Sequence, residues 1–124
     1  SMITLELLKH AQSVQKMAHA KYSNYPVGAA LLAENGEIIT GCNIESKAYP
    51  TTMCAERVAL FSALSQGITS FSMIAVATRD GAMPCGSCRQ VLFEYTGDIT
   101  VIIGNGEGIV KEINLGELLP HPFV

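Results

Sequence analysis

Apolar residues in the first part of the chain recur every three or four positions, a spacing typical of a helix with one buried face. The apolar stripe consists of Leu7, Ala11, Val14 and Ala18. We therefore expect a first helix over residues 4–20. Tyr22-Ser23-Asn24-Tyr25-Pro26 then interrupts the pattern and predicts a loop.

Two short apolar runs follow this loop and are expected to be strands, Val27–Leu32 and Glu37–Cys42. They are separated by Glu34-Asn35-Gly36, and Asn-Gly between two apolar runs is a strong signal for a hairpin. The polar segment Asn43–Thr52 predicts a long loop after the second strand.

The second half of the chain alternates between helical and strand-like patterns. Helices are expected at residues 54–66, 85–95 and 115–119, and strands at residues 73–77, 99–103 and 108–113. The last strand is expected at an edge of the sheet, after a turn at Gly104-Asn105-Gly106. This order of elements implies a mixed sheet of about five strands with helices on both faces, a three-layer α/β/α fold.

Composition narrows the class of protein. With 124 residues, the chain is expected to form one domain over residues 1–124. Hydrophobic residues make up 48% and charged residues 15%, which is apolar for a small monomer and favours a homo-oligomer. The net charge of −3 without a basic run argues against nucleic acid as a partner. No apolar run has the length of a membrane span, and the N-terminal pattern is not a secretory signal, so we expect a cytoplasmic protein.

Three cysteines and one glutamate are the candidate residues of a catalytic metal site. Cys54 and Cys85 each open a predicted helix, and Cys88 follows Cys85 by one helical turn. Helix N-termini lower the pKa of thiols and so favour thiolates. Thiolates suit Zn²⁺, and three of them leave the fourth position of a tetrahedral site open for water. The pattern therefore predicts a hydrolytic zinc site with Cys54, Cys85 and Cys88 as ligands.

Glu56 can serve this site under one geometric condition. Two residues along a helix correspond to about 200° of rotation, so Cys54 and Glu56 point apart unless Cys54 lies at the cap, outside helical geometry. If Cys54 lies at the cap, Glu56 faces the open coordination position of the zinc ion and can take a proton from the water bound there. Arg57, and from the other helix Gln90, are expected to donate hydrogen bonds to the ligand sulfurs.

Two other interpretations of the cysteines remain. Cys85-Gly86-Ser87-Cys88 also resembles a dithiol redox motif at a helix start, although this leaves Cys54 and Glu56 unexplained. A closed structural zinc site would need Cys42 as its fourth ligand. Cys42 ends an apolar strand, where a buried inert thiol is more common.

Five patches of the sequence, in this order, resemble one known family. They are Tyr22-Ser23-Asn24-Tyr25-Pro26-Val27-Gly28-Ala29, Gly41-Cys42-Asn43-Ile44-Glu45, Cys54-Ala55-Glu56-Arg57, Pro84-Cys85-Gly86-Ser87-Cys88-Arg89-Gln90 and Leu118-Leu119-Pro120. Together they resemble the small, homotetrameric, zinc-dependent cytidine deaminases, and the resemblance spans essentially the whole chain. It implies hydrolytic deamination of cytidine and 2′-deoxycytidine to the uridines, a step of pyrimidine salvage.

The resemblance also implies roles for individual residues. Glu56 would be the proton shuttle, and zinc would be held by the three cysteines. The substrate contacts would be Asn43 and Glu45 on the ribose, Tyr25 and the Ala55 amide at the base, and Phe123 reaching into a neighbouring subunit's site. The sequence departs from the family in a slightly shorter Thr78–Met83 loop and in Ser46-Lys47. The main rival within the wider superfamily of zinc deaminases is an enzyme that acts on another aminopyrimidine nucleoside or on a nucleoside antibiotic such as blasticidin S. Asn43 and Glu45 argue for a free ribose and against this rival.

Overall fold

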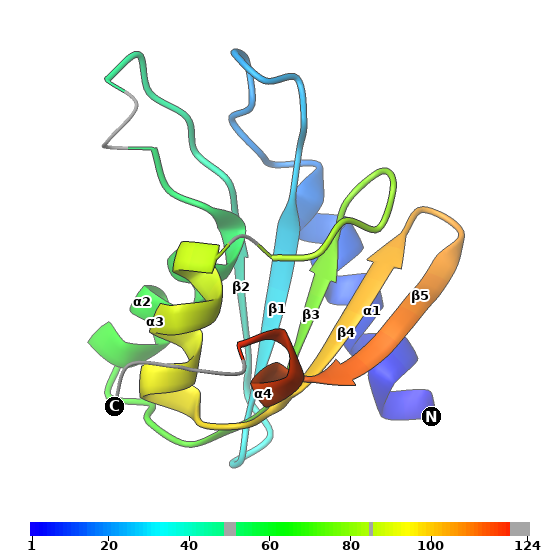
Figure 1. Ribbon diagram of the computed structural model, residues 1–124, viewed down its shortest axis with the longest axis vertical. Coiled ribbons are helices and arrows are strands. Elements are labelled where there is room, and N and C mark those ends of the chain that lie inside the picture. Colours follow the sequence, from blue (N-terminus) through cyan, green and yellow to red (C-terminus); the bar gives the residue numbers. More distant parts are fainter. Residues whose placement is uncertain (49–51, 85, 120–124) are drawn as a thin grey trace.

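The computed structural model describes residues 1–48, 52–84 and 86–119 of the chain. Its centre is a five-stranded sheet in the order β2-β1-β3-β4-β5 (Figure 1). The strands are β1 (Gly28–Ala33), β2 (Ile38–Cys42), β3 (Phe71–Ala77), β4 (Thr100–Asn105) and β5 (Gly108–Asn114). β3 and β4 run parallel, and the other neighbouring pairs are antiparallel. The predicted mixed sheet, with residues 108–113 at its edge, is confirmed.

Helices cover both faces of the sheet (Figure 1). They are α1 (Met2–Gln15), α2 (Ala55–Ser65), α3 (Gly86–Thr96) and the short α4 (Leu115–Leu118). Along β1, Ala29 and Leu31 face the core shared with α2 and α3, while Ala30 and Leu32 face the core under α1. This alternation gives a three-layer α/β/α fold, as predicted. No helix within the described ranges has both the length and the apolar character needed to cross a bilayer.

α1 ends at Gln15, five residues before the predicted end of the first helix. The cause is a long-range contact rather than a local signal. The His19 N–H donates to the carbonyl of Asn43 at 2.9 Å, and the Glu45 N–H donates to the carbonyl of His19 at 2.9 Å. His19 is therefore drawn into a short parallel bridge with Ile44. The predicted helix 4–20 is wrong beyond Gln15 for this reason.

β4 extends through Gly104 and Asn105, which the sequence predicted as part of a turn. A Cβ atom at Gly104 would lie 2.5 Å from Cδ1 of Leu8, so glycine lets α1 pack directly on this strand. β3 also begins earlier than predicted, at Phe71 rather than Met73. Both differences lengthen the central strands of the sheet. The Asn35-Gly36 hairpin is confirmed, with Gly36 at a φ of 93°.

The backbones of β2 and α2 are in close contact, which fixes the position of α2. A Cβ atom at Gly41 would lie 2.5 Å from the Ala59 nitrogen and 2.6 Å from the Ala55 carbonyl oxygen. The first turn of α2 therefore rests directly on the sheet. α2 and α3 begin at the same end of the sheet, beside the loop that follows β3 (Figure 1).

Candidate metal centre and active site

Cys54 is the N-cap of α2 and has extended backbone geometry, with φ −77° and ψ 157°. This is the condition under which its side chain and that of Glu56 can converge, and the predicted cap is confirmed. Ala55 is the first residue inside the helix and is fully buried. At this position the backbone N–H has no acceptor within the helix and is available to a ligand.

Ligand atoms of Cys54, Glu56 and Cys88 all lie within 4.8 Å of one another. Cys88 is fully buried on the first turn of α3, and Glu56 is 4% exposed. Two soft sulfur donors and a carboxylate at two helix starts form a donor set that zinc accepts. Cys85, the third predicted ligand, lies outside the described residues.

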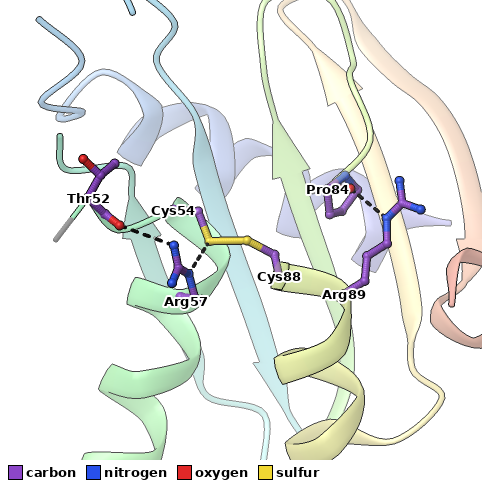
Figure 2. The surroundings of a disulfide bond; sticks show 6 residues. All are labelled: Thr52, Cys54, Arg57, Pro84, Cys88 and Arg89. Atoms are coloured by element: carbon purple, nitrogen blue, oxygen red, sulfur yellow. Dashed lines mark hydrogen bonds between the residues drawn. A yellow bond between two sulfur atoms is a disulfide. The ribbon is translucent and has the colours of Figure 1, made fainter. Parts of the chain in front are cut away.

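The structure joins the sulfurs of Cys54 and Cys88 as a disulfide (Figure 2). The sequence predicted two separate thiolates instead. The Cα atoms of the pair are 7.4 Å apart, whereas disulfides usually span about 4.4–6.8 Å. This backbone spacing suits two thiolates that share one cation better than it suits a direct sulfur–sulfur bond. The pair must be reduced for both sulfurs to bind zinc.

Arginine side chains hold both sides of this centre (Figure 2). Arg57 donates through Nε to the Cys54 sulfur at 3.1 Å and through Nη2 to the Thr52 carbonyl at 3.4 Å. Arg89, to which the sequence assigned no separate role, donates to the carbonyls of Pro84 at 2.7 Å and Leu118 at 3.0 Å. Arg89 thereby ties the start of α3 to α4.

Gln90 donates to the Glu94 carboxylate at 2.9 Å, one turn later on α3. Its expected bond to a ligand sulfur stays a prediction. Cys42 carries a free, half-buried thiol at the end of β2. Burial raises the pKa of the Cys42 thiol, which disfavours its thiolate form. Among the described residues, Cys42 does not join the metal-ligand group, so that group does not match the closed zinc site considered from the sequence.

Burial also raises the pKa of the Glu56 carboxyl, opposed by its own backbone N–H and by the nearby charge of Arg57. A carboxyl whose pKa is moved toward neutrality can both accept and return a proton. Glu56 therefore has the environment of a general acid–base group.

A cavity of about 180 Å³ opens beside Cys54 and Glu56. Its other lining residues are Tyr25, Val27, Val76, Thr78, Ala82, Met83 and Pro84. Tyr25, expected from the resemblance to line the base pocket, is one of the residues around this cavity, and its contact with a base stays a prediction. Sequence reasoning missed Thr78, which is buried at the end of β3. A polar residue directly after a buried strand was the signal that could have found it.

Asn43 and Glu45 are not among the residues that line this cavity. The Asn43 amide donates to the Tyr25 carbonyl and accepts from the Val27 N–H, both at 2.9 Å. Glu45 accepts from the backbone N–H groups of Tyr22 and Ser23, each at 3.0 Å, and from the Ser23 hydroxyl. Both side chains therefore shape the Tyr22–Val27 loop, a role that the sequence did not predict. Their expected ribose contacts stay predictions, and Phe123 lies outside the described residues.

Comparison with known proteins agrees with this site. The family model of the cytidine and deoxycytidylate deaminase zinc-binding region matches residues 3–105. A cytidine deaminase of Sporosarcina psychrophila is 45% identical over 121 residues, which cover 95% of this chain and 89% of that protein. A blasticidin-S deaminase of Bacillus cereus is 34% identical over 130 residues, covering 96% of this chain and 91% of that protein.

The fold comparison gives the same result. The crystal structure of a cytidine deaminase from Burkholderia pseudomallei superposes with a TM-score of 0.90 at 41% identity, covering 95% of this chain and 97% of that one. The family model spans the residues that form the sheet's first four strands together with Cys54, Glu56 and Cys88. The chain therefore belongs to the zinc-dependent cytidine deaminase family.

Proposed function

We propose that this protein hydrolyses cytidine and 2′-deoxycytidine to the corresponding uridines and ammonia. The observation that carries the proposal is the buried Glu56 carboxylate beside the sulfurs of Cys54 and Cys88, at the wall of a small cavity. The cavity is smaller than the roughly 300–1,000 Å³ of typical drug-sized sites, so it suits a single pyrimidine ring.

Cys54, Cys85 and Cys88 would hold the zinc ion. Bound zinc supplies Lewis acidity, which lowers the pKa of a water molecule to near neutrality. Three thiolates reduce that acidity, and the Arg57 hydrogen bond to Cys54 offsets part of the loss by withdrawing charge from the sulfur.

Glu56 moves the protons of the reaction. Its carboxylate takes a proton from the attacking water as the oxygen adds to C4 of the ring. The same carboxyl delivers that proton to N3. It then takes the proton of the new C4 hydroxyl and passes it to the amino group, so the C4–N bond breaks, ammonia leaves and the C4 carbonyl of the uridine forms. One group thus serves as base and then as acid, which its buried position permits.

Other residues position the substrate. The Ala55 N–H would donate to the pyrimidine carbonyl, and the Tyr25 ring would lie against the base. The ribose would extend beyond the cavity toward Asn43 and Glu45. Each carboxylate oxygen can accept more than one hydrogen bond, so Glu45 can bind a ribose hydroxyl while it holds Ser23.

The single domain would work as a cytoplasmic homotetramer in pyrimidine salvage, with sites shared between subunits through Phe123. Large apolar side chains on the surface of the single chain support an assembly. The exposed ones are Met2, Ile3, Leu5, Met17, Tyr22, Ile44, Phe61, Met83, Tyr95, Ile109 and Val110. The net charge of −3 supports a small nucleoside rather than nucleic acid as the partner.

An ultraviolet assay of the zinc-loaded protein tests the proposal. Cytidine, 2′-deoxycytidine, cytosine, cytidine monophosphate and blasticidin S are compared at equal concentration. We expect turnover of the two nucleosides to exceed that of the other three. Turnover of the nucleotide alone, or of blasticidin S alone, would overturn the assignment.

A further inference from the structure

Two loops line part of the cavity beside Glu56. One is the loop before β1, which contributes Tyr25, and the other is Thr78–Pro84 after β3, which contributes Thr78, Ala82, Met83 and Pro84. The loops are far apart in the sequence but adjoin a residue pair of the sheet, Gly28 on β1 and Ala77 on β3. Beyond that pair, their relative position depends on contacts between the loops. Contacts between the two loops therefore hold this part of the cavity wall in place.

Side chains of neighbouring residues in the second loop reach across to the first. The Tyr25 hydroxyl donates to the Asp80 carboxylate, and Arg79 donates through Nη1 to the Asn24 carbonyl at 2.9 Å. The Arg79 guanidinium also lies 5.0 Å from the centre of the Tyr25 ring, within the range of a cation–π contact. We call these four residues, Asn24, Tyr25, Arg79 and Asp80, the latch.

Both loops joined by the latch are also stabilised by hydrogen bonds of their own. Thr78 donates to Asp80 at 3.2 Å and accepts from the Ala82 N–H at 3.0 Å, so the second loop is closed on itself. The Thr78 N–H donates to Gly104 on β4 at 3.1 Å, which anchors that loop to the sheet. On the other side, the Tyr25 N–H donates to the Ser23 hydroxyl at 3.0 Å. The latch therefore joins two supported loops rather than two loose ones.

The chemistry of the pair makes the bond specific. The hydrogen bond from the Tyr25 hydroxyl is the main cause that lowers the pKa of the Asp80 carboxyl below its usual value. Asp80 is therefore charged at neutral pH. A hydrogen bond to a charged acceptor is about twice as strong as a neutral one. Phenylalanine in place of Tyr25 would keep the ring in the cavity wall but would lose this bond.

We propose that Asp80 is a positioning residue that acts through the Tyr25 hydroxyl to fix the face of the cavity against which the pyrimidine ring binds. This inference rests on the proposed function, because it assigns the bound ring to that face. It gives the Thr78–Met83 loop a role in substrate affinity, whereas the proton transfer by Glu56 does not depend on the latch.

Steady-state kinetics of Tyr25→Phe, Asp80→Ala and the double variant test the inference. Each single change is expected to raise KM for cytidine about threefold to tenfold, the range of one lost hydrogen bond, with kcat within about twofold of the parent. The double variant should match the weaker-binding single variant, because both changes remove the same bond. KM values that multiply in the double variant, or a parent-like KM in either single variant, would refute the inference. Glu112→Gln, which removes an exposed carboxylate on β5, is the matched control.

Amide hydrogen exchange gives a readout that does not need activity. Tyr25→Phe and Asp80→Ala should speed exchange in peptides covering residues 20–27 and 77–84 but not in a peptide covering β5. Unchanged exchange in both loops would show that the latch does not hold them, whatever the kinetics. A parent protein without cytidine turnover but with latch-dependent exchange would refute the proposed function while leaving the contact between the loops intact.

Discussion

The Nε atom of Arg57 lies 3.1 Å from the sulfur of Cys54, one turn earlier on the chain (Figure 2). Residues three positions apart at a helix start are neighbours on its surface, so Arg57 can reach the sulfur of Cys54, the N-cap residue of α2. The Arg57 guanidinium also reaches the Thr52 carbonyl, so it fixes the chain that approaches the helix as well as the sulfur. Arg57 therefore acts on both the charge and the position of a predicted zinc ligand.

Arg57→Ala should weaken zinc binding about 10–100-fold, the usual cost of losing a partner of a metal ligand, while the fold is kept. Competition with a chromogenic chelator would measure the zinc affinity, and circular dichroism would report the fold. Arg57→Lys is the matched variant, because it keeps the charge but cannot bind the sulfur and the Thr52 carbonyl together. Parent-like zinc affinity in Arg57→Ala would show that the hydrogen bond does not support the metal.

Zinc binding should depend on the redox state of Cys54 and Cys88. Without zinc between the sulfurs, the two helix starts can approach by the small distance that a disulfide needs. A thiol oxidant should then join Cys54 and Cys88 in zinc-free protein, remove both thiols from titration and prevent zinc binding. A reductant should restore both the thiols and the zinc content. Atomic absorption and thiol titration measure the two quantities on the same sample.

Cys42→Ser is the control for the redox experiment, because this thiol lies outside the metal group. The variant should bind zinc and respond to oxidation as the parent does. If the oxidised parent kept its zinc, Cys54 and Cys88 would not be joint ligands.

Some of this structure follows from local rules and was predictable. The requirement that Cys54 cap its helix came from the geometry of two neighbouring residues, so no knowledge of distant contacts was needed. The hairpin at Gly36 likewise depends on a short segment, Asn-Gly between two apolar runs. These features were predicted because the sequence that decides them is contiguous.

Features decided by distant contacts were not predictable. α1 ends early because His19 pairs with Asn43 and Glu45, more than twenty positions later. Asn43 and Glu45 are occupied in the single chain by the Tyr22–Val27 loop, although their polar character indicated a ligand. The hydrogen bond of Arg89 to Leu118 spans 29 positions. In each case, no sequence pattern around the distant hydrogen-bond partner indicates the contact.

The close contact between Gly41 and α2 should support both the stability of the fold and the zinc site. Gly41→Ala would force a Cβ atom against the backbone of Ala55 and Ala59, which cannot move without displacing the helix start. We expect a loss of about 1–3 kcal/mol or more in the free energy of unfolding, together with weaker zinc binding. Chemical denaturation of the zinc-loaded protein measures the first effect.

Gly106→Ala is the control for Gly41→Ala, because a Cβ atom at Gly106 would meet nothing within 4 Å. Its free energy of unfolding should stay within about 0.5 kcal/mol of the parent. Equal stability of the two variants would mean that α2 can shift on β2 without cost.

Glu56 sits among the potential metal ligands, so its role must be separated from that of a ligand. A ligand and a proton shuttle respond differently to substitution. Glu56→Ala and Glu56→Gln remove the acid–base group, and deamination of cytidine should fall by about 10²–10⁴-fold. The zinc content per chain should be unchanged in both variants, because three cysteines hold the ion in the proposed site. Loss of zinc together with activity would make Glu56 a ligand, and near-parent turnover would remove it from the reaction.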